Sequence, residues 1–346
     1  MVGEQILFCV VIALALTYTF TNGFQDGSSV CAAAVTSRAM SPPQAVRFVA
    51  LCELAGALFG GSAVAISMQS ITTHPANTAL LPILVSALTA AISWNFITRR
   101  LRLPSSSTHA LVGGIMGALY GEGGSEYINW GHATSLWQAT GVMKVVMALF
   151  LSPLIGFLAG FGCLVLLVVL LSRSSMRAGK PLKFLQWAMT GLLAFGHGAN
   201  DPQKSMGVMM LAIHSMGGTA TEIPLLVRVS TGIAIGTGIL SLAPGIVKRV
   251  GGKIYKLRNV HAAAVEMASA FVVVGGSITG APVAASQVIS SSVVGVGTAV
   301  RPKRLGWLVV RDMLIAWCLT IPCSGMLACG LHLLGYQIFN FITTWK

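Results

Sequence analysis

The sequence contains few charged residues: Asp, Glu, Lys and Arg together make up 9% of its 346 residues. Soluble domains contain about 25% charged residues, so this scarcity excludes an ordinary soluble fold. Apolar residues make up 55% of the chain and the mean hydropathy is +0.80. Apolar runs long enough to cross a bilayer recur along the whole length. The composition therefore predicts an all-α polytopic membrane protein.

The sequence also lacks cysteine motifs and the features of a cleavable signal peptide. The seven cysteines form no C-x-x-C pair and lie in apolar segments, which argues against a disulfide framework or a zinc site. The N-terminal apolar run carries Glu4 where a signal peptide has a basic region, and no A-x-A site follows it. We therefore expect this run to remain as the first helix. No cofactor is indicated.

The net charge of +13 does not indicate a nucleic-acid partner, because the basic residues gather in short loops between apolar segments. Such loops usually face the cytoplasm. We place the basic loops there, at residues 38–47, 99–102, 173–183, 248–258 and 301–304. The loop 121–136 contains two Glu and no Lys or Arg, so it is expected outside.

About ten apolar segments are expected to cross or enter the membrane. They cover residues 5–37, 43–70, 78–98, 104–120, 137–171, 184–215, 223–246, 262–279, 282–300 and 306–335. Gly or Pro beside an Asp predicts helix breaks at 22–26 and 197–202. The stretches 78–120 and 262–300 are each either two crossings or a re-entrant hairpin.

An acidic motif occurs twice. Its copies are N-G-F-Q-D, which ends at Asp26, and H-G-A-N-D-P, which contains Asp201. Pro104 follows Asp26 by 78 residues, Pro282 follows Asp201 by 81, and each proline opens a segment with hydroxyl side chains. The chain therefore contains an internal repeat of one unit. Because carboxylates are costly at membrane depth, two equivalent ones indicate an ion or solute site.

The two units are expected in opposite orientations. If the basic loops are cytoplasmic, the first acidic helix runs inward and the second runs outward, as in many secondary transporters with inverted repeats. The sequence predicts a first transmembrane repeat at 1–136, a long connecting helix and basic loop at 137–183, and a second, inverted repeat at 184–346.

Broken helices would supply ligands for two ions. Half-helices that begin after Asp26 and Asp201 would present N–H groups to an anion. The carboxylates and freed carbonyls would suit a small hard cation such as Na⁺. The segment Ser105–Thr108 adds hydroxyl and N–H donors of the kind that bind phosphate-like anions without Arg.

Four stretches resemble signatures of the inorganic phosphate transporter family. They are Asn22–Val46, Trp94–Gly114, His197–Ile213 and Val265–Gly297, and they occur in the family's order. The resemblance implies a permease with inverted repeats that moves inorganic phosphate through the lipid bilayer with Na⁺ or H⁺, often as a homodimer. The short loops and compact length favour a prokaryotic inner membrane.

The resemblance also implies roles for single residues. Coupling cations would be held by Asn22, Asp26, Asn200 and Asp201, with Na⁺ at the two aspartates. Phosphate would be bound by Gln25 and by two polar tips. The residues of the tips are Ser105, Ser106, Ser107 and Thr108 in the first tip and Ser286 and Gln287 in the second.

The second tip departs from the family pattern. Family members usually carry Ser-Thr-Thr after Pro-Val, whereas this chain has Ala284, Ala285 and Ser286. Two hydroxyls are missing, which keeps open a permease for another tetrahedral oxyanion such as sulfate, or a non-transporting or sensory relative.

Four other polar residues have two interpretations each. Glu53 and Glu266 either serve the transport pathway or are paired structural carboxylates. Lys204 either neutralises Asp201 or the anion, or extends to a helix end. His109 follows the first tip and either takes part in proton coupling or is a fixed hydrogen-bond donor.

Two other functional classes fit less well. An ion channel would more naturally repeat its filter around an oligomeric axis than invert it within one chain. An enzyme would need an oriented nucleophile and base, and the Ser105–His109 segment has no carboxylate to orient its histidine.

Overall fold

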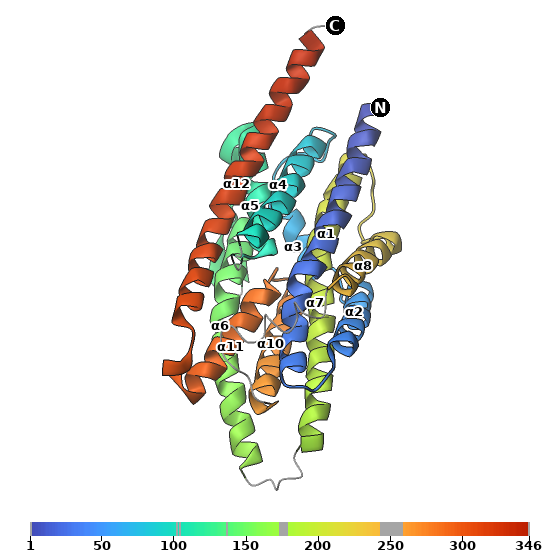
Figure 1. Ribbon diagram of the computed structural model, residues 1–346. Helices are drawn as coiled ribbons and strands as arrows, with labels where there is room; N and C mark the ends of the chain where they lie inside the picture. The colour runs from blue at the N-terminus through green and yellow to red at the C-terminus, as the bar shows by residue number, and fades with distance from the viewer. Residues whose placement is uncertain are drawn as a thin grey trace.

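Long helices form almost all of the computed structural model, which describes residues 2–101, 103, 105–135, 138–172, 179–242 and 259–344 (Figure 1). The chain is an all-α membrane protein, as its composition predicted. The first half contains α1 (Val2–Thr36), α2 (Pro42–Phe59), α3 (Ala63–Gln69), α4 (Leu80–Arg100), α5 (Ser107–Gly123), the short helix η1 (Gly124–Tyr127) and α6 (Gly141–Leu171). The second half contains α7 (Gly179–Ser215), α8 (Leu225–Leu240), α10 (Asn259–Thr279), α11 (Ala285–Val300), the short helix η3 (Pro302–Arg304) and α12 (Trp307–Thr344).

A small antiparallel ribbon precedes α6. Its strands are β1 (Ala133–Ser135) and β2 (Gln138–Ala139), and Ala133 is paired with Ala139. The ribbon lies outside the helical core and does not contribute to the arrangement described below.

Within the described residues, five helices are long and apolar enough to cross a membrane: α1, α4, α6, α10 and α12. The pair α2 and α3 would be a sixth if it counts as one bent span. The predicted number of ten segments remains a prediction. Helix α7 is longer than most of these but carries a polar middle section that is buried inside the protein.

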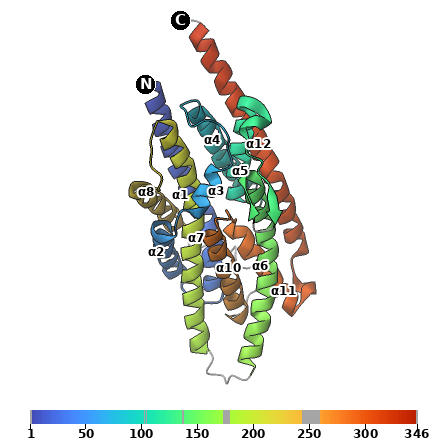
Figure 2. The same cartoon turned by 180° about the vertical axis from the view of Figure 1, so that it is seen from behind.

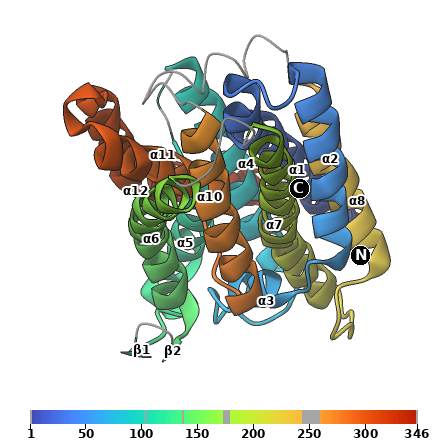
Figure 3. The same ribbon diagram turned by 90° about the horizontal axis from the view of Figure 1, so that it is seen from below.

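The two acidic helices cross the centre of the molecule in opposite directions. In Figure 1, α1 runs down from the N-terminus and α7 runs up from the lower end. Helices α6 and α12 are likewise antiparallel, and Figure 2 shows the same arrangement from behind. Seen from below in Figure 3, α2 and α8 lie on one flank, whereas α6, α11 and α12 lie on the other.

Packing between the halves is reciprocal. Helix α1 packs against α8 and α7 packs against α2, while α5 packs against α12 and α11 packs against α6. Each half therefore buries its helices largely against the other half. The hydrophobic core is accordingly shared between the two halves of the sequence.

The predicted breaks in the acidic helices were wrong. Helix α1 continues through residues 22–26, and α7 continues through 197–202 with Pro202 inside it. The glycines serve close packing instead: a Cβ at Gly23 would meet the backbone of Ile235, and one at Gly198 would meet the backbone of Glu53. The expected half-helix N-termini after Asp26 and Asp201 are therefore absent from these two described helices.

A bend does occur between α2 and α3, whose axes differ by 69°. Gly61 lies in this connection with φ +85°, a backbone conformation that glycine adopts without strain. The side chain of Gln203 on α7 fixes the bend from across the interface. Its Nε2 donates to Gly60 O at 3.0 Å, and its Oε1 accepts from Val64 N at 2.9 Å.

Two helical hairpins approach the centre from opposite ends. Helices α4 and α5 occupy the upper half of Figure 1, and α10 and α11 occupy the lower half. The first tip joins α4 to α5, and the second tip, residues 282–287, joins α10 to α11. Both tips therefore end in the interior, beside the acidic helices.

Some sequence predictions fall outside the described residues. They are Pro104, the arginines of the basic loops at positions 102, 173 and 177, and the basic loop 248–258. Lys180 and Lys183, from the same cluster as the arginines at 173 and 177, lie in the first turns of α7.

The close contact between α7 and α2 gives a stability prediction. Gly198→Ala would place a methyl group on the backbone of Glu53, and such overpacking costs about 1–3 kcal/mol. We expect a lower thermal unfolding midpoint for the purified protein in detergent. Gly162→Ala on α6 is the matched control, because its Cβ would meet nothing within 4 Å. Equal midpoints for the two variants would contradict the packing argument.

Candidate functional site

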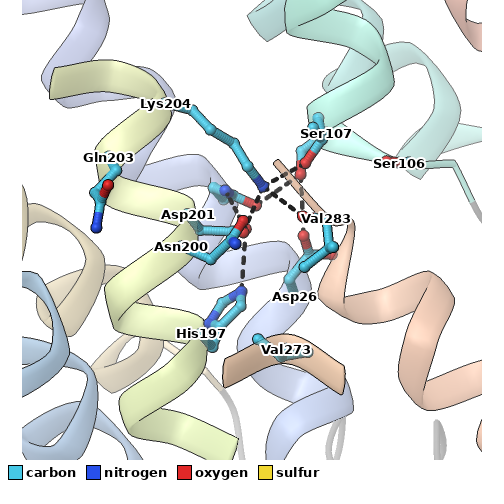
Figure 4. Close-up of polar contacts among 12 residues, drawn as sticks. Asp26, Ser106, Ser107, His197, Asn200, Asp201, Gln203, Lys204, Val273 and Val283 are labelled. Atoms are coloured by element: carbon cyan, nitrogen blue, oxygen red, sulfur yellow. Dashed lines mark hydrogen bonds and ion pairs between the residues drawn. The ribbon is translucent and has the colours of Figure 1, made fainter. Parts of the chain in front are cut away.

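The two repeated aspartates meet at the centre of the bundle. Asp26 on α1 and Asp201 on α7 are buried, with 3% and 1% of their surface exposed. Ligand atoms of Asp26, Asp201 and His197 all lie within 4.8 Å of one another (Figure 4). The antiparallel crossing of α1 and α7 thus creates a candidate cation site from residues far apart in the sequence.

Both carboxylate oxygens of Asp201 have hydrogen-bond partners. Its Oδ2 accepts from Nδ2 of Asn22 at 2.7 Å and lies 3.1 Å from Nε2 of His197. Its Oδ1 accepts from Nζ of Lys204 at 2.5 Å. Asn22 on α1 therefore contacts the aspartate of the other half of the chain.

Asp26 is less fully satisfied. The hydroxyl of Ser107, in the first tip, lies 3.0 Å from Asp26 Oδ2 and 2.7 Å from Asn22 Oδ1. One hydroxyl carries one proton, so it can donate to only one of these oxygens at a time. The hydroxyl of Tyr18 holds Ser107 in place by donating to its carbonyl oxygen at 3.0 Å. The carboxylate of Asp26 can therefore accept a further ligand.

Glu53 is linked to the aspartates through His197. His197 Nδ1 lies 2.7 Å from Glu53 Oε1, and both side chains are fully buried. The other Glu53 oxygen, Oε2, has no partner within the described residues. Glu53 is thus a paired carboxylate, which is one of its two interpretations, and its partner His197 also contacts Asp201.

His197 was missed as a site residue by the sequence reasoning, although it lies in the quoted motif. A detectable signal was its position four residues before Asp201, which places both side chains on one face of a helix. Gln203 was also missed. Nothing in its local sequence indicates that it contacts the distant α2–α3 bend.

Lys204 does not extend to a helix end. Its side chain is fully buried, and its Nζ donates to Asp201 Oδ1, to Thr108 Oγ1 at 2.6 Å and to Val283 O at 2.8 Å. Figure 4 shows the side chain pointing between the tips. Lys204 therefore connects an acidic helix to both tips.

We call Asp26, Glu53, His197, Asp201 and Lys204 the central cluster. It contains three carboxyl groups but only two side chains that can carry positive charge. Even with a protonated histidine, three ionised carboxylates leave one negative charge in excess. Because an uncompensated buried charge is costly, either a bound cation or a proton on one carboxyl group would balance the cluster.

The first tip is held by its own hydrogen bonds. Ser106 caps α5 by accepting from the backbone N of His109 at 3.3 Å, and its Oγ lies 2.9 Å from His109 Nδ1. Ser105 donates to Thr98 Oγ1 at 2.6 Å. Gln287 of the second tip places Nε2 3.4 Å from the same His109 nitrogen. His109 thus connects the two tips.

Other predicted residues lie at or beyond the edge of this network. Asn200 donates to Ala281 O at 3.0 Å, so it contacts the segment before the second tip rather than either aspartate. The side chains of Gln25 and Ser286 have no hydrogen bond within the part of the chain that the structure describes. Glu266 accepts from Thr190 Oγ1 at 3.0 Å, between α10 and α7, and is not part of the central cluster.

Comparisons with known proteins agree with the resemblance. The sequence profile described as "Phosphate transporter family" matches residues 22–328. The chain is 33% identical over 341 residues to a probable low-affinity inorganic phosphate transporter of Bacillus subtilis, covering 97% of this chain and 98% of that protein. A Rhizobium meliloti protein with the same description is 30% identical over 322 residues, covering 92% and 93% of the two chains.

The fold is also similar to that of a solved protein. The structure described as "The sodium-dependent phosphate transporter" superposes with a TM-score of 0.85, covering 96% of this chain and 100% of the other. The two sequences are 22% identical, so this likeness concerns the fold.

The hydroxyl of Ser107 gives a prediction about the central network. Ser107→Ala removes a donor to Asp26, and hydrogen bonds to charged groups contribute about 1.5–3 kcal/mol. Ser105→Ala removes a bond between two neutral hydroxyls, which contributes about 0.5–1.5 kcal/mol. We expect Ser107→Ala to lower the thermal unfolding midpoint more than Ser105→Ala does. The reverse order would show that Asp26 does not depend on this hydroxyl.

Proposed function

The chain belongs to the phosphate transporter family, and on this premise we propose that it carries inorganic phosphate across a bilayer together with a coupling cation, Na⁺ or H⁺. As a member of a transporter family it is not an enzyme. The observation that carries the proposal is the contact between a buried acidic cluster and two polar tips. Cation and anion sites that share side chains can affect each other's occupancy, which is what coupled transport requires.

We assign the coupling cation to the space between Asp26 and Asp201. The excess negative charge of the central cluster and the incomplete hydrogen bonding of Asp26 support this position. Oxygen ligands of this kind suit Na⁺, and a proton on a carboxylate would meet the same charge requirement. Asn22 supplies an amide oxygen beside Asp26. Asn200, also predicted to hold a cation, would act by positioning the second tip.

We assign phosphate to the tips. The N-termini of α5 and α11 carry partial positive charge, which favours an anion. The first tip adds the hydroxyls of Ser105–Thr108, and the side chains of Gln25 and Ser286 are free to contribute in the described structure. Entry of phosphate would replace some of the bonds that the tip residues now make with one another.

Gln287 supports phosphate over sulfate as the anion. Its Oε1 is a buried acceptor without a donor among the described residues. A protonated phosphate carries a P–O–H group that can donate to such an oxygen, whereas the sulfate dianion has no proton to donate. An unsatisfied buried acceptor costs about 1–3 kcal/mol, so the partner that satisfies it is favoured.

The architecture proposed for transport is a pair of inverted repeats, 1–136 and 184–346, joined by the segment 137–183. The antiparallel directions of α1 and α7 support it, as does the packing of α1 against α8 and of α7 against α2. The hairpins α4–α5 and α10–α11 would be re-entrant. The bacterial relatives support a location in a bacterial inner membrane. The homodimer stays a prediction from the family resemblance.

The transport proposal is tested with the purified protein in proteoliposomes. We expect uptake of labelled phosphate driven by an imposed Na⁺ or H⁺ gradient, with phosphate competing better than sulfate. Asp26→Asn should reduce concentrative uptake by at least about ten-fold, because it removes a charged ligand of the cation. Asp312→Asn is the matched control, since Asp312 is half exposed on α12 and paired with Arg311.

The possible outcomes separate the parts of the proposal. Wild-type protein that takes up no phosphate under either gradient would contradict the transport function. Normal gradient-driven uptake by Asp26→Asn would leave that function standing but remove the cation from Asp26. Stronger competition by sulfate than by phosphate would favour the other oxyanion.

The proposed topology predicts that the two ends of α6 lie on opposite sides of the membrane. Ser125 in η1 and Ser172 after α6 are exposed near these ends. In a variant without the seven native cysteines, we expect an impermeant thiol reagent to label Ser125→Cys from outside and Ser172→Cys only from the cytoplasm. Labelling of both from one side would contradict the inverted repeats, and the cysteine-free parent measures the background.

A further inference from the structure

Lys204 has the surroundings of a bound cation. Its Nζ contacts a carboxylate oxygen of Asp201, the hydroxyl of Thr108 and the carbonyl of Val283, at 2.5, 2.6 and 2.8 Å. Carboxylate, hydroxyl and carbonyl oxygens are ligands that a small hard cation also prefers. A lysine ammonium has three protons, and each of them has an acceptor here.

The position of this ammonium excludes an ion from the same place. Lys204 and Asp201 are both fully buried, and they lie on one face of α7 at a spacing of three residues. A metal ion on Asp201 Oδ1 would be a second positive charge beside Nζ in a low-dielectric interior, where repulsion is strong. Lysine is almost never fully buried unless it is paired, so the burial of Lys204 depends on its ion pair with Asp201.

The two halves differ at this position. Ser29 follows Asp26 by three residues, as Lys204 follows Asp201. A neutral side chain therefore takes the place of the ammonium on α1. Of the two repeated aspartates, only Asp201 is followed three residues later by a positively charged side chain.

We propose that the ammonium of Lys204 is a built-in cation. It occupies the position between Asp201, Thr108 and Val283 where one exchangeable Na⁺ would otherwise bind. The inference rests on the proposed function and refines it. The exchangeable cation binds on the Asp26 side, while the positive charge at Asp201 Oδ1 is the ammonium of Lys204. The number of Na⁺ ions bound per chain is then one lower than it would be with a neutral residue at position 204. Because Nζ also contacts both tips, this charge stays beside the phosphate-binding segments.

Equilibrium binding of radioactive sodium to the purified protein in detergent tests the proposal. We expect Lys204→Met to bind one more Na⁺ per chain than the wild type, at the oxygens that Nζ leaves. Asp201→Asn combined with Lys204→Met should bind no additional Na⁺, because the carboxylate is also gone. Lys144→Met is the matched control: it removes a partly buried lysine from α6, outside the central cluster, and should leave the count unchanged.

Thermal unfolding gives a second measurement that remains informative if Lys204→Met is unstable. Replacing choline with sodium should raise the unfolding midpoint of Lys204→Met by more than it raises that of the wild type. The sodium effect on the double variant should not exceed the effect on the wild type. A site specific to the folded state changes the unfolding equilibrium by about 100-fold when Na⁺ is at 100 times its Kd. This shift would be absent if the lysine were only a structural partner of Asp201.

Two results would overturn the proposal. One is an unchanged Na⁺ count together with sodium stabilisation of Lys204→Met no larger than that of the wild type. The other is loss of phosphate binding in that variant at every Na⁺ concentration, which would make Lys204 a phosphate ligand. Phosphate counterflow by the wild type distinguishes these from failure of the proposed function: without counterflow the function is wrong, and with it only the role of Lys204 is.

Discussion

The structure depends on keeping two carboxylates, Asp26 and Asp201, buried where the central helices cross. Such groups persist only when hydrogen bonds and opposite charge compensate for lost hydration. The compensating groups come from α1, α7 and the first tip, through Asn22, Lys204 and Ser107. Lys204 also donates to Val283 O of the second tip. The bonds that stabilise the carboxylates therefore also fix how four segments meet. Stability of the centre and geometry of the candidate site arise from one network.

Close helix packing makes this network possible. Gly23 allows α1 to approach α8, and Gly198 allows α7 to approach the backbone of α2 at Glu53. The second contact brings the Glu53 carboxylate to His197, one turn along α7 from Asp201. A bulkier residue at position 198 would separate these helices and break the link. The glycines of the repeated motif thus determine distances rather than backbone breaks.

The sequence predicted the elements of the site better than its geometry. Composition predicted the membrane class, and motif spacing singled out the two aspartates and both tips, which the structure brings into contact. These features depend on local residue patterns. The breaks at 22–26 and 197–202 were wrong because glycine near a charge fits close packing as well as helix interruption. The contacts of Gln203 with the α2–α3 bend and of Lys204 with the tips join segments more than 75 residues apart in sequence, and no local pattern encodes such partners. His197 carried a local signal in its four-residue spacing to Asp201.

Equivalent positions in the two acidic helices carry different chemistry. Four residues before the aspartate, α1 has the neutral amide of Asn22 and α7 has the imidazole of His197. The fixed ammonium, too, is found on α7 and not on α1. Similar backbone arrangements therefore surround an electrostatically uneven centre. In the proposed transport function, this unevenness gives the two ligands different places: the cation is attracted to the less compensated Asp26, and the anion to tips that contact a lysine. Two acidic helices that both carried a neutral residue three positions after the aspartate would attract cations equally on both sides and would offer the anion no lysine.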